Sequence, residues 1–239
     1  MKAVAISGVG VLSPLGNGLS GSVDALIRGE GGLVAPGDDL RGMGVCGAGR
    51  VRLASPGGSD RAECLAVEAG REALADAGLR PGELPERSLV CVSASKGAIH
   101  SLEACLRAGR LDGGLHSLGA SAPALALCRE VMSVGPAVAC AAACATGMLS
   151  VLTAVREVYS GRADLALAGA CESSLTRFLH AGFQRMGALV SGDGDPSGAV
   201  RPFDAGRMGF LLAEGAAVLV LESPDRVARR GASVRALIT

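Results

Sequence analysis

The protein has 239 residues, and at roughly 150 residues per domain this length allows one large domain or two small ones. Basic and acidic residues balance at 23 each, so bulk charge cannot hold nucleic acid. Aromatic residues make up only 2% of the chain, which excludes aromatic stacking platforms. With 49% apolar residues and no linker or repeat, the sequence predicts a single domain over residues 1–239 with a sizeable core.

The sequence has no run of about eighteen uninterrupted apolar residues, the length that a membrane-spanning helix needs. Its first residues, MKAVAISG, lack the apolar region and the cleavage site of a secretion signal and have the pattern of a first strand. We therefore expect no membrane span and a cytoplasmic location.

Eight cysteines are spread along the chain without any C-x-x-C pair. The three histidines, His100, His116 and His180, have no metal-ligand spacing to a cysteine, so we expect neither a metal site nor a cofactor. A disulfide framework is untypical of a cytoplasmic chain of this length. Most of the cysteines lie within apolar runs and are expected to be small buried hydrophobic residues.

The predicted elements alternate between strands and helices along the chain. Helix 60–77 shows how they are recognised: Asp60 and Glu63 form a capping pair, small apolar residues line one face, and Gly78 ends the helix. The same reasoning predicts strands at 2–9, 88–93, 136–143, 164–170, 210–212, 216–221 and 234–239, and helices at 20–28, 97–107, 120–132, 145–160 and 173–187. This alternation indicates an α/β domain with helices on both faces of a largely parallel sheet.

Cys144 has surroundings that differ from those of the other cysteines. The predicted small-residue strand 136–143 ends at this residue, and the predicted helix 145–160 begins directly after it. A thiol at a helix N-terminus faces unpaired N–H groups and the positive end of the helix dipole, which favours the nucleophilic thiolate. The same N–H groups can hold an oxyanion during acyl transfer. The local pattern is equally compatible with one more buried cysteine before a helix.

Several segments, taken in order, resemble the N-terminal half of the β-ketoacyl-acyl-carrier-protein synthases. These are the condensing enzymes of fatty-acid and polyketide synthesis, which have the thiolase fold. The resemblance extends over essentially the whole chain and is more specific than any one segment. The segments are ISGVGVLSPLGN (6–17), ACATG (143–147), AGACE (168–172), RPFDAGRMGF (201–210), AEGA (213–216) and LE (221–222).

The resemblance implies an α/β thiolase-like half, with a mixed five-stranded sheet between helix layers and Cys144 at the head of a buried helix. It implies that Cys144 is acylated by a carrier-protein thioester and that Arg207 helps to receive the acidic acyl carrier protein. In the family, the strand before the nucleophile pairs across a two-fold axis. Residues 136–143 are therefore the expected contact of a homodimer, or of a heterodimer with a second ketosynthase-like chain or a C-terminal-half chain.

Two positions depart from the family pattern: Met208 replaces a usual acidic residue, and the turn at 93–97 has fewer glycines than is common. The family's two catalytic histidines, its catalytic lysine and its Gly-Phe-Gly turn belong to the C-terminal half, beyond these 239 residues. We therefore expect that this chain alone does not condense. His180 is a possible secondary catalytic residue that could pair with Cys144, although a partly exposed structural histidine is the expectation. We expect His100 and His116 to be solvated. Lys96 could be a charge that faces a ligand, but an exposed turn residue is the expectation.

Three functions remain open on the sequence. The first is a condensing-enzyme subunit that accepts an acyl group on Cys144 and condenses only with a separate C-terminal-half partner. The second is a non-catalytic ketosynthase-like subunit that docks a carrier protein or another synthase subunit. The retained cysteine argues against it. The third is a stand-alone acyltransferase or thioesterase that uses Cys144.

Overall fold

The computed structural model describes residues 3–54, 59–110, 118–192 and 194–239 of the chain. Within these residues the main sheet has six strands in the order β2-β1-β7-β6-β5, with β8 also paired to β1. The strands are β1 (Val4–Ser13), β2 (Gly16–Asn17), β5 (Ser88–Ala94), β6 (Leu165–Glu172), β7 (Gly215–Glu222) and β8 (Ala236–Ile238). A second, two-stranded sheet pairs β3 (Leu33–Val34) with β4 (Ala48–Gly49).

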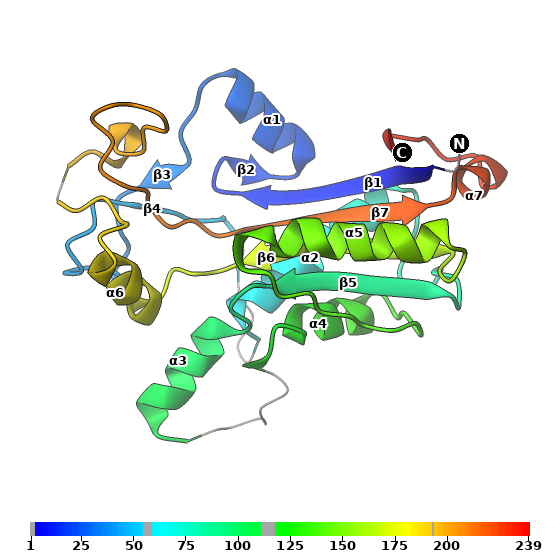
Figure 1. Ribbon diagram of the computed structural model, residues 1–239, viewed down its shortest axis with the longest axis horizontal. Coiled ribbons are helices and arrows are strands. Elements are labelled where there is room, and N and C mark those ends of the chain that lie inside the picture. The colour runs from blue at the N-terminus through cyan, green and yellow to red at the C-terminus, as the bar shows by residue number, and fades with distance from the viewer. Residues whose placement is uncertain (1–2, 55–58, 111–117, 193) are drawn as a thin grey trace.

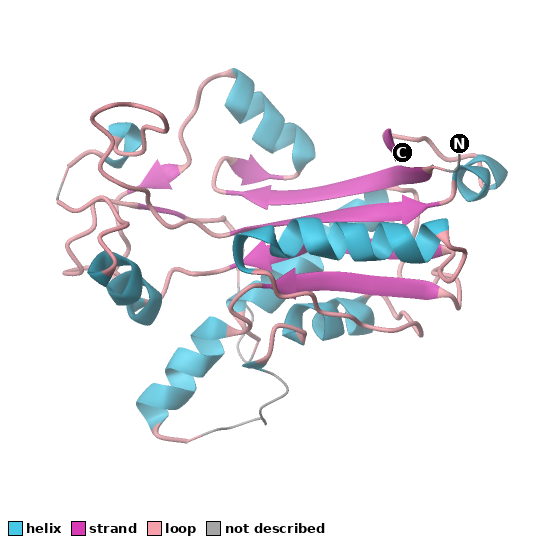
Figure 2. Ribbon diagram, viewed as in Figure 1, coloured by secondary structure: helices cyan, strands magenta, loops and turns pink. Residues whose placement is uncertain are grey.

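The helices form layers on both faces of the main sheet (Figures 1 and 2). Helices α2 and α4 pack on one face and α5 packs on the other, whereas α3 and α6 lie beyond the end of the sheet at which α5 begins. The helices are α1 (Leu19–Ile27), α2 (Arg61–Asp76), α3 (Ile99–Ala108), α4 (Ala122–Glu130), α5 (Thr146–Tyr159), α6 (Arg177–Arg185) and α7 (Pro224–Arg229). None of these described helices is both long and apolar enough to cross a membrane.

The predicted α/β architecture with a mixed sheet between helix layers is confirmed, but the strand arrangement differs in two respects. The sheet has six strands rather than five, because two-residue strand β2 folds back on the end of β1. The expectation of a largely parallel sheet is wrong: among the described strands of this sheet, only β5 and β6 pair in parallel. Strand β7 lies antiparallel between β1 and β6.

Two of the predicted strands are extended segments without a ladder. Residues 136–143 pair with β5 only at Val90, which donates its N–H to the Pro136 carbonyl and accepts the N–H of Val138. Two residues further on, the Cys140 N–H donates to the Ser93 hydroxyl instead of to a backbone oxygen. The segment therefore follows β5 through a single bridge and leaves the edge. Residues 210–212 likewise make only one isolated bridge, between Leu189 and Phe210.

Helix α2 lies directly on the backbone of β1. A Cβ atom at Gly10 would lie 1.9 Å from the Ala69 carbonyl oxygen, so only glycine permits this approach. Glu72 and Asp76 on the same helix accept the N–H groups of Val11 and Val9, at 2.8 and 2.9 Å. The predicted cap of this helix is also present, because the Asp60 carboxylate accepts the Ala62 N–H at 2.9 Å. The helix thus supplies both packing and hydrogen bonds to the first strand.

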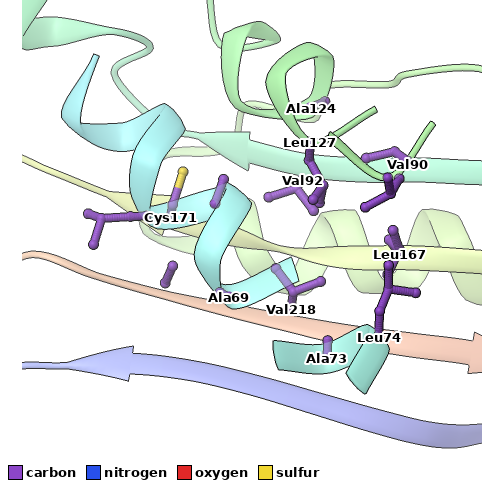
Figure 3. Packing of buried hydrophobic residues seen from close by; sticks show 14 of the residues in the cluster. Ala69, Ala73, Leu74, Val90, Val92, Ala124, Leu127, Leu167, Cys171 and Val218 are labelled. Atoms are coloured by element: carbon purple, nitrogen blue, oxygen red, sulfur yellow. The ribbon is translucent and has the colours of Figure 1, made fainter. Parts of the chain in front are cut away.

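Figure 3 shows the core between α2, α4 and the sheet. Alanines and leucines of the two helices meet valines and leucines of β5, β6 and β7; examples are Ala69, Ala73, Leu74, Ala124, Leu127, Val90, Val92, Leu167 and Val218. Because alanine has a short side chain, the helices approach the sheet closely. The many alanines of the sequence therefore form a tightly packed layer.

Helix α5 buries one face against the sheet and exposes the other. Its inner face contributes Ala154 and Val158 to a second core cluster with β5 and β6. Its outer face exposes Met148, Leu152 and Tyr159, with 78% of Met148 accessible. The helix after Cys144 is therefore buried on its inner face, as expected, but exposed on its outer face.

We predict that Gly10→Ala destabilises the protein by at least about 1–3 kcal/mol, because the added methyl group must push α2 away from β1. Urea unfolding followed by circular dichroism measures the change. Gly21→Ala is the control, because this position lies within α1 and a Cβ atom there meets nothing within 4 Å. The control is expected to gain up to about 1 kcal/mol, and equal stability of Gly10→Ala and wild type would contradict the close packing.

Candidate active site

Cys144 lies in a short 3-10 turn, η2 (Ala143–Ala145), between the extended segment and α5. Ala143 has a φ of +48°, in the left-handed region, which costs a residue with a Cβ atom about 1–2 kcal/mol. The buried Thr146 hydroxyl donates to the Ala143 carbonyl oxygen at 2.8 Å and accepts the Ala142 N–H at 3.0 Å. One side chain thus holds the strained turn that presents Cys144.

The Cys144 side chain is exposed at the start of a 14-residue helix, as its sequence position predicts. Within the described residues, the first turn of α5 has no side-chain cap and no acidic residue. Its N–H groups and the positive end of its dipole are therefore not neutralised by a carboxylate. Such an arrangement can stabilise the oxyanion of an acyl-transfer intermediate.

A pocket of about 620 Å³ opens beside Cys144. It lies where β5 and β6 end and β7 begins, and α6 contributes one aromatic side chain, Phe183. Small side chains provide much of the lining and leave room for a ligand. The lining residues are Ser95, Lys96, Ala143, Cys144, Thr146, Gly147, Ala170, Cys171, Glu172, Phe183, Gly215, Ala216 and Ala217.

The polar wall of this pocket is an ion pair that the sequence did not predict. Lys96 Nζ lies 2.8 Å from Glu172 Oε2 and 2.9 Å from Ser95 Oγ, and the Ser95 hydroxyl donates to the same carboxylate oxygen. Burial favours a higher pKa for Glu172, but the hydrogen bonds from Lys96 and Ser95 and the lysine charge lower it overall. The expectation that Lys96 is an exposed turn residue is wrong, because Glu172 draws the lysine into the pocket wall.

The structure does not bring His180 to Cys144. His180 lies in α6 and is fully buried, with Nδ1 at 3.2 Å from the Thr176 carbonyl oxygen. Burial lowers the pKa of His180, with opposing contributions from the Thr176 carbonyl and Asp39. One helical turn further on, Phe183 lines the pocket, whereas His180 does not. The expected partial exposure of His180 is also wrong, because the helix turns this side chain inward.

His100 also does not line the pocket beside Cys144. His100 is half-buried rather than solvated, since its Nε2 lies 2.8 Å from the Ser173 hydroxyl. Ser173 in turn donates to Glu214, at 3.4 Å, and Glu214 pairs with Arg61 at 2.6 Å. This network therefore holds His100 against the core. His116 lies outside the described residues.

All eight cysteines are free thiols, but their environments differ. Burial raises the pKa of Cys91 to about 12, with a further contribution from Cys140, whose sulfur lies 3.7 Å away. Burial also raises the pKa of Cys171. These two thiols remain protonated at neutral pH, whereas Cys144 is the one exposed thiol among the eight. Within the described residues, no group of three or more His, Cys, Asp or Glu side chains could hold a metal ion.

Arg207 lies in an exposed loop, together with Met208. The Arg207 guanidinium donates to the Asp204 carbonyl oxygen at 3.1 Å, so the loop backbone orients it. Met208 exposes 60% of its surface. The guanidinium is therefore accessible to a partner, as its predicted role requires.

Sequence reasoning found Cys144 but missed the residues that support it. Thr146 stands two positions after the cysteine, and the motif ACATG contains the signal: a hydroxyl residue in the first turn of a helix can bond the preceding backbone. Lys96 and Glu172 lie 76 residues apart and have no local pattern that could join them. They meet because β5 and β6 pair in parallel and end side by side.

The comparisons with known proteins agree with this geometry. A family model described as "Beta-ketoacyl synthase, N-terminal domain" matches residues 55–226. The tetracenomycin polyketide synthase ketoacyl synthase alpha subunit of Streptomyces glaucescens is 32% identical, over 97% of this chain and 60% of that protein. The 3-oxoacyl-[acyl-carrier-protein] synthase 2 of Vibrio harveyi is 30% identical, over 98% of this chain and 61% of its own length.

Solved structures show the same fold. One is AntDE:AntF, a type II polyketide synthase acyl-carrier protein in complex with its ketosynthase bound to the hexaketide. It matches with a TM-score of 0.86 and 25% identity, over 99% of this chain and 62% of that chain. The chain thus spans about 60% of the length of these relatives. It belongs to the β-ketoacyl synthase family, and its fold is thiolase-like.

We predict that limiting iodoacetamide alkylates Cys144 at least about tenfold faster than Cys91 or Cys171, because those two thiols are buried and have raised pKa values. Peptide mapping by mass spectrometry measures the rates in the native protein. Cys105, half-buried and outside the pocket, reports how much exposure alone contributes. Labelling of Cys144 no faster than Cys91 would contradict an accessible nucleophile.

Proposed function

We propose that the protein is a condensing-enzyme subunit of fatty-acid or polyketide biosynthesis, in which Cys144 accepts an acyl group from an acyl carrier protein. The observation that carries this proposal is the exposed Cys144 thiol on a strained turn at the head of α5, beside a pocket with room for a ligand. Family membership supports the same chemistry. We retain the prediction that residues 1–239 form one N-terminal ketosynthase domain.

The proposed step is a thiol–thioester exchange. The sulfur of Cys144 attacks the thioester carbonyl carbon, and a tetrahedral oxyanion forms. The N–H groups at the start of α5 stabilise this oxyanion. The intermediate collapses as the carbon–sulfur bond to the carrier breaks, and the proton lost by Cys144 ends on the departing carrier thiol. The acyl group is then held as a thioester on Cys144, with its chain in the adjoining pocket.

Condensation requires more than this step, and we propose that a C-terminal-half partner supplies the rest. Decarboxylation of a malonyl group needs donors that stabilise the enolate, and in this family histidines and a lysine do so. Among the described residues that line the Cys144 pocket there is no histidine, and the lysine is already paired with Glu172. A hydrolase or acyltransferase built on a Cys144–His180 pair is disfavoured, because His180 is buried elsewhere in α6.

Two surface regions, the loop of Arg207 and the segment 136–143, are the proposed contacts with a carrier protein and with a second ketosynthase-like chain. We propose that Arg207 contributes to binding the acidic acyl carrier protein, since its guanidinium is exposed and held by the loop backbone. A related ketosynthase binds its acyl-carrier protein in a solved complex, which supports a partner of this class. The segment 136–143 follows β5 at the edge of the sheet, and we propose it as a contact with a second ketosynthase-like chain, in a homodimer or a heterodimer.

We also propose a cytoplasmic location for the protein. Eight free thiols, including an exposed Cys144, suit a reducing compartment. Carrier-protein thioesters, the proposed substrates, would have to be present in the same compartment.

We predict that the 239-residue chain becomes acylated on Cys144 when it is incubated with an acyl-acyl-carrier-protein thioester. Intact-mass spectrometry should show one added acyl group on the wild type and none on Cys144→Ala, whereas Cys105→Ala should react as the wild type does. A wild type that gains no acyl group, or a Cys144→Ala variant that gains one, would contradict the proposal.

The same incubation with malonyl-acyl carrier protein tests the need for a partner. The chain alone is expected to form no ketoacyl product. Product formed by this chain would show that its own residues complete the condensation and would overturn the partner requirement.

A further inference from the structure

The pocket beside Cys144 has one polar wall, and most of its other lining residues are small. Ser95, Lys96 and Glu172 form this wall, and alanines and glycines from β6, β7 and the start of α5 line much of the remainder. The lysine and glutamate side chains are 29% and 30% exposed, so both are largely withdrawn from solvent yet still reach the pocket surface. Any acyl chain that fills this space contacts an ion pair.

The ion pair leaves a donor unused. A lysine ammonium carries three N–H donors. In the described residues, two of them have acceptors, namely Ser95 Oγ at 2.9 Å and Glu172 Oε2 at 2.8 Å. The third N–H of Lys96 is left for a water molecule or for an acceptor on a bound ligand. A hydrocarbon chain would displace that water and offer no acceptor in return, which costs free energy.

The charge of the wall determines which acceptor fits. Lys96 and Glu172 sum to zero, and the hydrogen bonds of Ser95 and Lys96 keep the glutamate ionised. A carboxylate on the ligand would gain from the lysine but would be repelled by Glu172. A neutral oxygen, such as a ketone or a hydroxyl group, accepts the third lysine N–H without that repulsion.

We propose that the Lys96–Glu172 pair selects acyl groups that carry a neutral oxygen on the chain, and that it disfavours plain saturated acyl chains. Lys96 donates its third N–H to this oxygen, and Glu172 and Ser95 hold the ammonium in position. The proposal rests on the proposed function, because it concerns the acyl group that Cys144 receives. It makes Lys96 a specificity-determining residue.

The test compares two carrier-protein thioesters of equal chain length, 3-oxohexanoyl and hexanoyl. Rates of Cys144 acylation are measured by intact-mass spectrometry on the 239-residue chain. The wild type is expected to prefer the 3-oxo chain by about tenfold or more, the value of one hydrogen bond to a charged group. Lys96→Met, which keeps the length but removes the donor, should lose this preference.

Two further variants separate recognition from stability. Lys96→Met combined with Glu172→Gln removes both charges, so it leaves no unpaired carboxylate and should also show no preference. Arg162→Met removes a surface cation that pairs with Glu157 outside the pocket, and it should keep the preference of the wild type. Thermal unfolding of each variant shows that the comparison is made on folded protein.

Binding of non-reactive amide analogues of the two thioesters to Cys144→Ala gives a second measurement that does not depend on acyl transfer. Tighter binding of the 3-oxo amide, abolished by Lys96→Met, supports the proposal. Equal rates and equal binding for the two chains in the wild type, or a preference that survives in Lys96→Met, would overturn the specificity while acylation of Cys144 still stands. If Cys144 takes up neither acyl group, the proposed function fails, and the specificity that rests on it fails with it.

Discussion

The hydroxyl of Thr146 connects the three parts of the chain that present Cys144. It accepts the N–H of Ala142 at the end of the extended segment and donates to the carbonyl of Ala143, and its own residue begins α5. Without such a clamp, an alanine at a φ of +48° would relax toward a more favourable conformation. Helix α5 packs against β5 and β6. The hydrogen bonds of Thr146 therefore fix the position of Cys144 relative to the sheet. The location of Cys144 therefore depends on the Thr146 side chain, which fixes the backbone on either side of the thiol.

The pocket follows from the same arrangement. Its floor consists of small residues at the end of β6 and the start of β7. These two strands are paired neighbours in the sheet, and a Cβ atom at Gly169 of β6 would lie 1.9 Å from the Ala217 carbonyl oxygen of β7. The open space lies at the end of the sheet. The parallel pairing of β5 with β6 places Lys96 beside Glu172 at that end and adds a polar wall to the space. The nucleophile, the cavity and the ion pair therefore all lie at the same end of the sheet.

The sequence predicted those parts of the fold that depend on local patterns. Helix α2, its Asp60 cap, helix α5 behind Cys144 and strand β6 all lie within one or two residues of the expected ranges, because periodicity and caps act over short distances. The antiparallel position of β7 could not be predicted, since it depends on pairing with β1, some two hundred residues earlier. The segment 136–143 has the composition of a strand, but the Ser93 hydroxyl takes the N–H of Cys140 and ends the pairing. The predicted exposure of Lys96 and His180 is wrong for a related reason. Whether each side chain faces solvent or the interior depends on residues distant in the sequence, such as Glu172 for Lys96.

The rate at which Cys144 accepts an acyl group in Thr146 variants tests the account most directly. Thr146→Val keeps the shape of the side chain but removes both hydrogen bonds, whereas Thr146→Ser keeps the hydroxyl. The account predicts that Thr146→Val transfers acyl groups from the carrier protein to Cys144 at least about tenfold more slowly than wild type, the equivalent of about 1.4 kcal/mol, and that Thr146→Ser restores most of the rate. Both variants should remain folded by circular dichroism. A Thr146→Val protein that is acylated on Cys144 as fast as the wild type would contradict the claim that this clamp presents the nucleophile.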